Sequence, residues 1–247
     1  LDISDPKFES GHTRHLTIKS PALGHRADIS LFVPPTQDKL DEPLPIVFLL
    51  HGVYGSHWAW IYKGGIHQTA IKLIKEDRIR PMVLVMPSDG LWNDGSGYLP
   101  HPNRNYEKWI INDVFHATIE TVEHANTNSP LFIAGLSMGG YGALRLAAKY
   151  PDRFRGCSGL SSITHIDQLI QMTEYKNRRF PVMEDEKSIL SFMLKNINHL
   201  PSIRFDFGKE DRLIEENRKL HQNLLHHGID HIYEEFGGGH NWDYWGK

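Results

Sequence analysis

Residues 135–142 read Gly-Leu-Ser-Met-Gly-Gly-Tyr-Gly and place a serine, Ser137, in the pattern G-x-S-x-G. The apolar run 131–134 predicts a short buried strand before it, and 139–150 predicts a helix that ends before Pro151. A tight turn between a strand and a helix pushes a serine hydroxyl out of the top of a sheet, and glycines there avoid collisions. The pattern therefore predicts a nucleophile; the alternative is a glycine-rich turn without a chemical role.

A serine hydroxyl attacks well only when a base takes its proton, and we expect His240 to be that base. It follows the predicted strand 231–236, and the glycines at 237–239 would let its loop carry the ring over the serine turn. The chain has 16 histidines, so residue type alone would not select this one. Its position selects it, because the order along such sheets is serine, acid, histidine.

The third partner is an acid that holds the imidazole in the required tautomer and stabilises its cation. Asp211 follows the predicted strand 202–207 in the loop Gly-Lys-Glu-Asp, and we expect it to be this acid. The alternative is that Asp211 only caps the helix that follows it. Glu210 is the nearest rival, and Asp206 is a weaker one because it lies inside the strand.

Charge that develops on the attacked carbonyl oxygen needs backbone N–H donors. Met138, directly after the serine, would supply one amide. The turn His51-Gly52-Val53 after the predicted strand 46–50 would supply the other, from Val53 first and Tyr54 second. The alternative for this turn is a simple tight connection.

Aromatic residues gather on loops at the carboxyl ends of the predicted strands, where sheets of this kind bind ligands. We expect substrate contacts from four of them, namely Trp58, Trp60, Trp92 and Trp242; the alternative is that they pack the loops. The chain offers no convincing metal ligand set. Its acidic turn (Asp89, Asn93, Asp94) and its histidine pairs (His12/His15, His226/His227) fit solvated surface better.

The elements that must position these residues follow a regular order. Strands are predicted over 13–19, 27–33, 46–50, 81–86, 131–134, 156–160, 202–207 and 231–236. Helices are predicted over 107–124, 139–150, 163–175, 186–196 and 211–227. Strands that alternate with helices after an antiparallel pair predict a three-layer α/β fold with a mostly parallel sheet. The length suits one domain, 1–247.

Composition excludes several partners. Lys and Arg number 27 against 30 Asp and Glu, a net charge of −3, so no broad basic surface favours nucleic acid. No apolar stretch approaches the roughly 18 residues that span a bilayer. The one cysteine, Cys157, excludes an intramolecular disulfide and leaves the compartment open. Because the chain begins at Leu1 and not at Met, a removed leader and hence a secreted or periplasmic location is favoured.

Three segments together resemble the esterase D-type branch of the α/β hydrolases: 51–55 (HGVYG), 135–142 and 238–245 (GGHNWDYW). This branch includes tributyrin and acetyl esterases, feruloyl esterases, S-formylglutathione hydrolases and mycolyltransferases. The resemblance implies an α/β-hydrolase fold that needs no cofactor or metal. It also implies a nucleophile, acid, base and oxyanion amides at the positions named above.

The resemblance implies a serine carboxylesterase that acts through an acyl-enzyme on a small-molecule or carbohydrate ester. With the aromatic loops, it favours acetyl or feruloyl groups on carbohydrate. One alternative is an acyltransferase that passes the acyl group to a sugar hydroxyl; another is a non-catalytic binding module. The turn after His51-Gly52 lacks the threonine-cysteine continuation typical of S-formylglutathione hydrolases, which argues against that activity.

Overall fold

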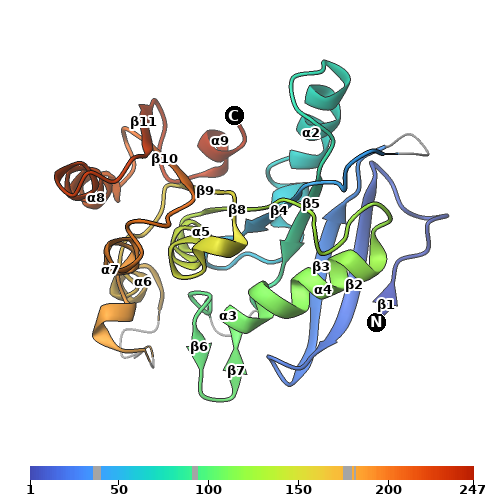
Figure 1. The fold of residues 1–247 in the computed structure, drawn as a ribbon, viewed down its shortest axis with the longest axis horizontal. Coiled ribbons are helices and arrows are strands. Elements are labelled where there is room, and N and C mark those ends of the chain that lie inside the picture. The colour runs from blue at the N-terminus through green and yellow to red at the C-terminus, as the bar shows by residue number, and fades with distance from the viewer. Residues whose placement is uncertain (36–39, 91–93, 175–179, 181) are drawn as a thin grey trace.

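The computed structural model describes residues 1–35, 40–90, 94–174, 180 and 182–247. Its main sheet has the strand order β1-β2-β3-β5-β4-β8-β9-β10-β11 (Figure 1). The strands of this sheet are β1 (Asp2–Ile3), β2 (Thr13–Ser20), β3 (His25–Phe32), β4 (Ile46–Leu50), β5 (Val83–Pro87), β8 (Leu131–Leu136), β9 (Gly156–Leu160), β10 (Ser202–Gly208) and β11 (Ile232–Phe236). A small ribbon, β6 (Pro100–His101) with β7 (Arg104–Asn105), lies apart from it.

The sheet is antiparallel from β1 to β5 and parallel from β5 to β11. The sequence explains the change. β2 and β3 form a hairpin across the turn 21–24, whereas β4 and β5 are short apolar runs that suit strands covered on both faces. Every residue of β5 is buried. The predicted class of fold is therefore confirmed: a mostly parallel sheet with antiparallel N-terminal strands.

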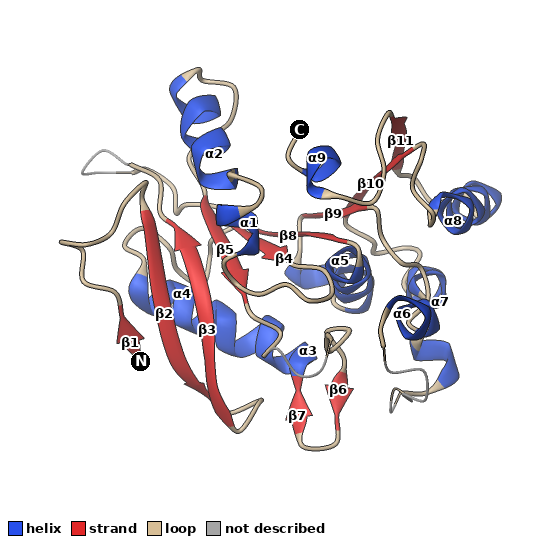
Figure 2. Cartoon of the chain, turned by 180° about the vertical axis from the view of Figure 1, so that it is seen from behind, coloured by secondary structure: helices blue, strands red, loops and turns tan. Residues whose placement is uncertain are grey.

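Helices cover both faces of the sheet (Figures 1 and 2). One apolar core joins the sheet to the helices α3 (Tyr106–Lys108), α4 (Phe115–Thr121), α5 (Met138–Lys149), α6 (Asp167–Met172), α7 (Ile189–Lys195) and α8 (Ile214–His226). A smaller core on the other face involves α1 (Ala59–Tyr62), α2 (Ile66–Lys75) and α9 (Trp242–Trp245). Single 3₁₀ turns lie at Pro151–Arg153 and Glu184–Glu186.

One predicted helix differs from the structure, and one helix of 10 residues was missed. The helix expected over 107–124 is continuous only to Thr121, and its middle, Trp109–Val114, is a π-helix. The Arg153 side chain donates a hydrogen bond to the Ile111 carbonyl, 2.9 Å away, which supports the widened turn. Helix α2 was not predicted.

The parallel strands bring the turns that carry the predicted site residues to one edge of the sheet. β4, β8, β10 and β11 run in the same direction, so the segments that follow them meet at their common carboxyl ends. These segments carry His51, Ser137, Asp211 and His240. Across the described residues, no helix is both long and apolar enough to span a bilayer.

Candidate active site

Ser137 lies at a strained turn between β8 and α5. Its backbone angles are φ 55° and ψ −119°, a conformation that costs a non-glycine residue on the order of 1–3 kcal/mol. The neighbouring glycines make the turn possible, because a Cβ on Gly139 would lie 2.2 Å from the Leu50 carbonyl oxygen. The Ser137 N–H donates to Leu160 O at 2.8 Å, which ties the turn to β9.

The His240 ring joins the serine to an acid. Its Nε2 lies 2.9 Å from Ser137 Oγ, and its Nδ1 lies 2.9 Å from Asp211 Oδ2. Because a carboxylate only accepts, the geometry assigns the proton to Nδ1 and leaves Nε2 free to accept from the serine hydroxyl. The edge of Trp245 packs against this ring, with centroids 4.9 Å apart and planes at 85°. The imidazole is thus fixed from three sides.

Asp211 is buried, with 2% of its surface exposed, and both carboxylate oxygens are used. Oδ2 faces His240, while Oδ1 accepts from the Leu213 N–H at 2.9 Å, so Asp211 also supports the start of the following helix. Burial alone would raise the pKa of Asp211, but the hydrogen bond from His240 and that from the Leu213 amide bring it below its usual value. The group therefore stays ionised beside the imidazole.

The two rival acids have other partners. Asp206 accepts a hydrogen bond from the Tyr244 hydroxyl at 2.6 Å and pairs with Arg204. Glu210 accepts from the Gly238 N–H through Oε2. Neither carboxylate bonds to His240.

Backbone contacts clamp the acid loop to the base loop. The Glu210 N–H donates to Gly238 O at 3.1 Å, and the Lys209 N–H donates to Phe236 O at 2.7 Å. Gly208 permits this approach, because a Cβ there would lie 1.9 Å from Gly238 O. These main-chain bonds, with the Gly238 N–H to Glu210 Oε2 bond, fix the spacing of the two loops that carry Asp211 and His240.

The candidate oxyanion donors differ in availability. The Tyr54 N–H is already bonded to Asp94 O at 3.0 Å. Within the described part of the chain the Val53 N–H has no acceptor, and Val53 lines the cleft at Ser137. Met138 is the first residue of α5, where an N–H has no partner within the helix. These observations favour Val53 over Tyr54.

His51 holds the turn that carries Val53. Its Nδ1 lies 2.7 Å from Gly52 O and its Nε2 accepts from the Asp89 N–H at 3.1 Å. The buried Tyr98 hydroxyl donates to His51 O at 2.9 Å. His51 is therefore a support for the turn and does not face the serine.

A cleft of about 390 Å³ opens above Ser137. Its lining includes three of the chain's tryptophans, Trp58, Trp242 and Trp245, and two cations, Lys63 and Arg212. The sequence did not single out these two cations. The signal it contains is their position, since Lys63 directly follows α1 in the segment after β4, and Arg212 lies on the loop after β10.

The four predicted substrate contacts have different outcomes. Trp58, 37% exposed, and Trp242 line the cleft, but Trp60 does not. Trp60 is 4% exposed and packs edge-on against Trp242, with centroids 5.7 Å apart, so it belongs to the core and corrects our expectation. Trp92 lies outside the described residues.

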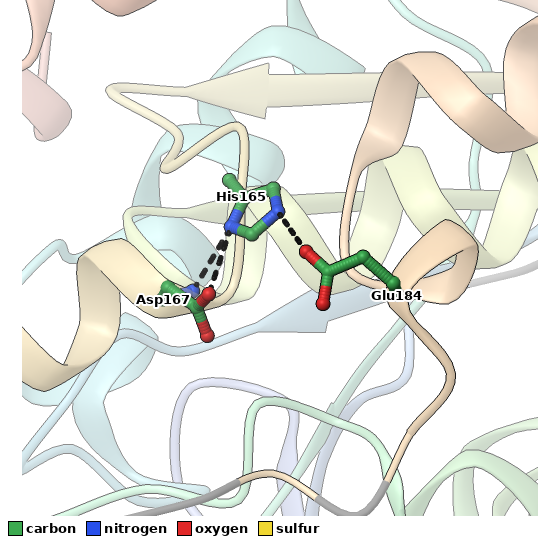
Figure 3. A group of neighbouring side chains, drawn as sticks. All are labelled: His165, Asp167 and Glu184. Carbon is green, nitrogen blue, oxygen red and sulfur yellow. Dashed lines mark hydrogen bonds and ion pairs between the residues drawn. The ribbon is translucent and has the colours of Figure 1, made fainter.

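A second cluster, His165, Asp167 and Glu184, has the residue types of a metal site (Figure 3). The Lys187 ammonium, however, lies 3.3 Å from Asp167 Oδ2 and 2.9 Å from Glu184 Oε2. The Asp167 N–H also donates to His165 Nδ1 at 3.3 Å. These residues therefore form, with Lys187, an ion-paired cluster that joins α6 to the 3₁₀ turn Glu184–Glu186.

The "Esterase" family model matches residues 20–247. The chain belongs to this esterase family. The acetyl esterase of Caldicellulosiruptor saccharolyticus is 29% identical over 230 residues, 85% of this chain and 82% of that protein. The S-formylglutathione hydrolase of Paracoccus denitrificans is 23% identical over 244 residues, 87% and 85% of the two chains.

Solved structures share the fold of this esterase. The Staphylococcus aureus fluorophosphonate-binding serine hydrolase F superposes with a TM-score of 0.81 at 22% identity, over 95% of this chain and 93% of that one. A ferulic acid esterase gives 0.74 at 20% identity, over 95% and 93%. The chain is thus a carboxylic ester hydrolase of the esterase D type with an α/β-hydrolase fold.

Proposed function

We propose that the protein hydrolyses carboxylic esters through an acyl-enzyme on Ser137. The observation that carries the proposal is the hydrogen-bonded series from Ser137 Oγ through the His240 ring to Asp211, with 2.9 Å at each step. In this series the hydroxyl donates to a nitrogen that can take its proton as the oxygen attacks the ester carbon.

The first half-reaction forms the acyl-enzyme. As Ser137 Oγ bonds to the carbonyl carbon, its proton moves to His240 Nε2, and Asp211 stabilises the resulting imidazolium. The carbonyl oxygen becomes an oxyanion that accepts from the N–H groups of Val53 and Met138. The intermediate collapses when the carbon–oxygen bond to the alcohol breaks, and the alcohol leaves with the proton from Nε2.

The second half-reaction, deacylation, regenerates the free enzyme. Water enters the place of the alcohol, gives its proton to His240 Nε2 and attacks the acyl carbon. The oxyanion forms again at the same two amides, and Ser137 leaves with the proton. Every charge that develops has a partner in the chain, so these steps need no group beyond the residues named.

For the substrate we propose an acetyl or feruloyl ester of a carbohydrate. Support comes from the acetyl esterase relative, from the ferulic acid esterase with the same fold, and from Trp58 and Trp242 in the cleft. Flat indole faces suit stacking by an aryl acid or the apolar face of a sugar ring.

The test compares kcat/KM for 4-nitrophenyl acetate, longer-chain 4-nitrophenyl esters and methyl ferulate. We expect a clear preference for acetate or ferulate and no turnover by the Ser137→Ala variant. Equal rates on all three would contradict the proposed acyl group, and full activity of the variant would contradict the mechanism. Product analysis with a sugar acceptor present should give free acid; a dominant transfer product would indicate an acyltransferase.

A further inference from the structure

Two cationic side chains that have no charged partner within the described ranges line the cleft. Lys63 follows α1 and Arg212 directly follows Asp211, and both line the space above Ser137. In the described part of the chain neither side chain has an ion pair or a hydrogen bond; Lys63 Nζ only lies 6.0 Å from the Trp58 ring centroid. Many other basic side chains are paired, as Arg218 is with Glu235 at 2.8 Å.

The cleft offers these cations no carboxylate. Among the described residues that line it there is neither Asp nor Glu. Asp94 and Glu174 lie close enough to Tyr54 to act on its hydroxyl, but neither lines the cleft or pairs with Lys63 or Arg212. The described lining of the cleft therefore carries two cationic side chains and no anionic one, whereas the chain as a whole carries a net charge of −3.

We propose that the ester carries an acidic group, a carboxylate, that Lys63 and Arg212 bind while the ester carbonyl lies at Ser137. Guanidinium and ammonium groups pair with carboxylates through charge-assisted hydrogen bonds, and guanidinium does so with two N–H donors. The tryptophans that line the same cleft, Trp58, Trp242 and Trp245, can then contact the ring or chain that separates the acid from the ester bond. This inference rests on the proposed ester hydrolysis. With an acetyl or feruloyl acyl group, which has no free carboxylate once esterified, the acid belongs to the alcohol part; an acid on the acyl part would replace that proposed acyl group.

The carboxylate can belong to the acyl part or to the alcohol part, and two matched pairs of esters separate these cases. Mono-4-nitrophenyl succinate against 4-nitrophenyl butyrate tests the acyl side. The 4-acetoxybenzoate anion against its methyl ester tests the alcohol side. We expect the acidic member of one pair to have a kcat/KM at least about tenfold higher, an advantage that falls with salt because exposed charges are screened.

Variants then tie the preference to the two residues. Lys63→Ala and Arg212→Gln should each reduce the acidic-to-neutral ratio by about three- to tenfold, and the double variant should remove it. Both esters of a pair react with Ser137, so a variant that slows this reaction equally for both leaves the acidic-to-neutral ratio of kcat/KM unchanged. Lys75→Ala is the matched control, since Lys75 is an exposed cation on α2 that does not line the cleft; it should leave the ratio unchanged.

The possible outcomes distinguish the acidic-substrate inference from the proposed ester hydrolysis. A ratio near one for both pairs, or a preference that survives in the double variant, would overturn the acidic-substrate inference while ester hydrolysis stands. Failure of all four esters to turn over would contradict the proposed hydrolysis itself, and the inference with it.

Discussion

The reaction corner (Ser137, Asp211 and His240) and the rim of the cleft (Tyr54, Trp58, Lys63 and Arg212) are built in different ways. In the corner Ser137 and Asp211 are each 2% exposed, and each functional atom has a bonded neighbour. At the rim Tyr54 is 59% exposed and Trp58 37%, and the two cations have no charged partner among the described residues. The corner is organised without a substrate, whereas in our proposal the cations of the rim find their partner on the substrate.

Electrostatic interactions in the reaction corner and at the rim should differ in the same way. A hydrogen bond in the buried corner acts through a low local dielectric and resists salt. Charges at the rim act through water and are screened over about 8 Å at physiological ionic strength. The difference suggests that changes in the corner alter kcat by orders of magnitude, while changes at the rim alter KM and selectivity by small factors.

The largest expected effect comes from the acid of the corner. Asp211→Asn places an amide opposite His240 Nδ1 and favours the wrong tautomer, so kcat should fall by about 10²- to 10⁴-fold. Glu210→Gln is the matched change in the preceding residue, whose carboxylate accepts from the Gly238 N–H and does not bond to His240. The kcat of this variant should fall by less than about tenfold. Steady-state kinetics on 4-nitrophenyl acetate would measure both. Similar losses of kcat in the two variants would contradict the assignment of Asp211, and not Glu210, as the acid.

A buried charge cluster beside α5 should set acid stability. Arg145 Nη1 lies 2.6 Å from Glu107 Oε2, and Lys149 and Tyr150 contact the other oxygen. Burial would raise the pKa of Glu107, but these partners lower it on balance. Glu107→Gln should cost about 3 kcal/mol of unfolding free energy at pH 7, since Arg145 keeps its buried charge.

The sign of the pH effect follows from the lowered pKa. Ionised Glu107 contributes stability above the unfolded-state value of about 4.3, and this contribution is lost as the pH falls through the lower folded-state value. Urea unfolding should therefore show the two proteins converging in strongly acid solution. The exposed pair Lys195–Asp185 is the control, and Asp185→Asn should change little at any pH. A constant difference between wild type and Glu107→Gln would contradict this account.

The turn at Ser137 should not tolerate a methyl side chain at position 139. Gly139→Ala would place a Cβ 2.2 Å from Leu50 O, and we expect a loss of about 3 kcal/mol or more in unfolding free energy. Gly237→Ala, in the base loop, meets no atom within 4 Å and should cost less than about 1 kcal/mol. Thermal unfolding followed by circular dichroism compares them, and equal losses would show that the turn is not packed as described.

The smallest expected effect is that of the rim tryptophan Trp58, for which the core tryptophan Trp60 is the contrast. Trp58→Ala should raise KM for the preferred ester about three- to tenfold with little change in stability. Trp60→Ala should instead cost about 3–5 kcal/mol of stability, because this side chain is buried against Trp242. The opposite pattern in kinetics and unfolding would reverse the assignment of the two residues.

The strands were predictable because each is a short apolar run between turn residues, as at Ile46–Leu50 and Leu131–Leu136. Chain order also identified Ser137, Asp211 and His240 as candidates, and the structure brings their side chains within hydrogen-bond distance. Their catalytic roles remain predictions.

Other features depend on contacts that the local sequence does not contain. The π-helix is supported by Arg153, a side chain from a distant segment. Trp58 and Trp60 differ by two positions, yet one faces the cleft and the other the core, because the short helix α1 turns them apart. Helix α2 escaped prediction although Ile66, Ala70 and Ile74 have helical spacing.

The most direct test of the reaction corner is reaction with a fluorophosphonate probe, followed by peptide mass spectrometry. We predict one rapidly labelled residue, Ser137, with labelling slowed strongly in His240→Ala and absent in Ser137→Ala. Labelling at another residue, or equal rates in wild type and His240→Ala, would contradict the claim that His240 activates Ser137.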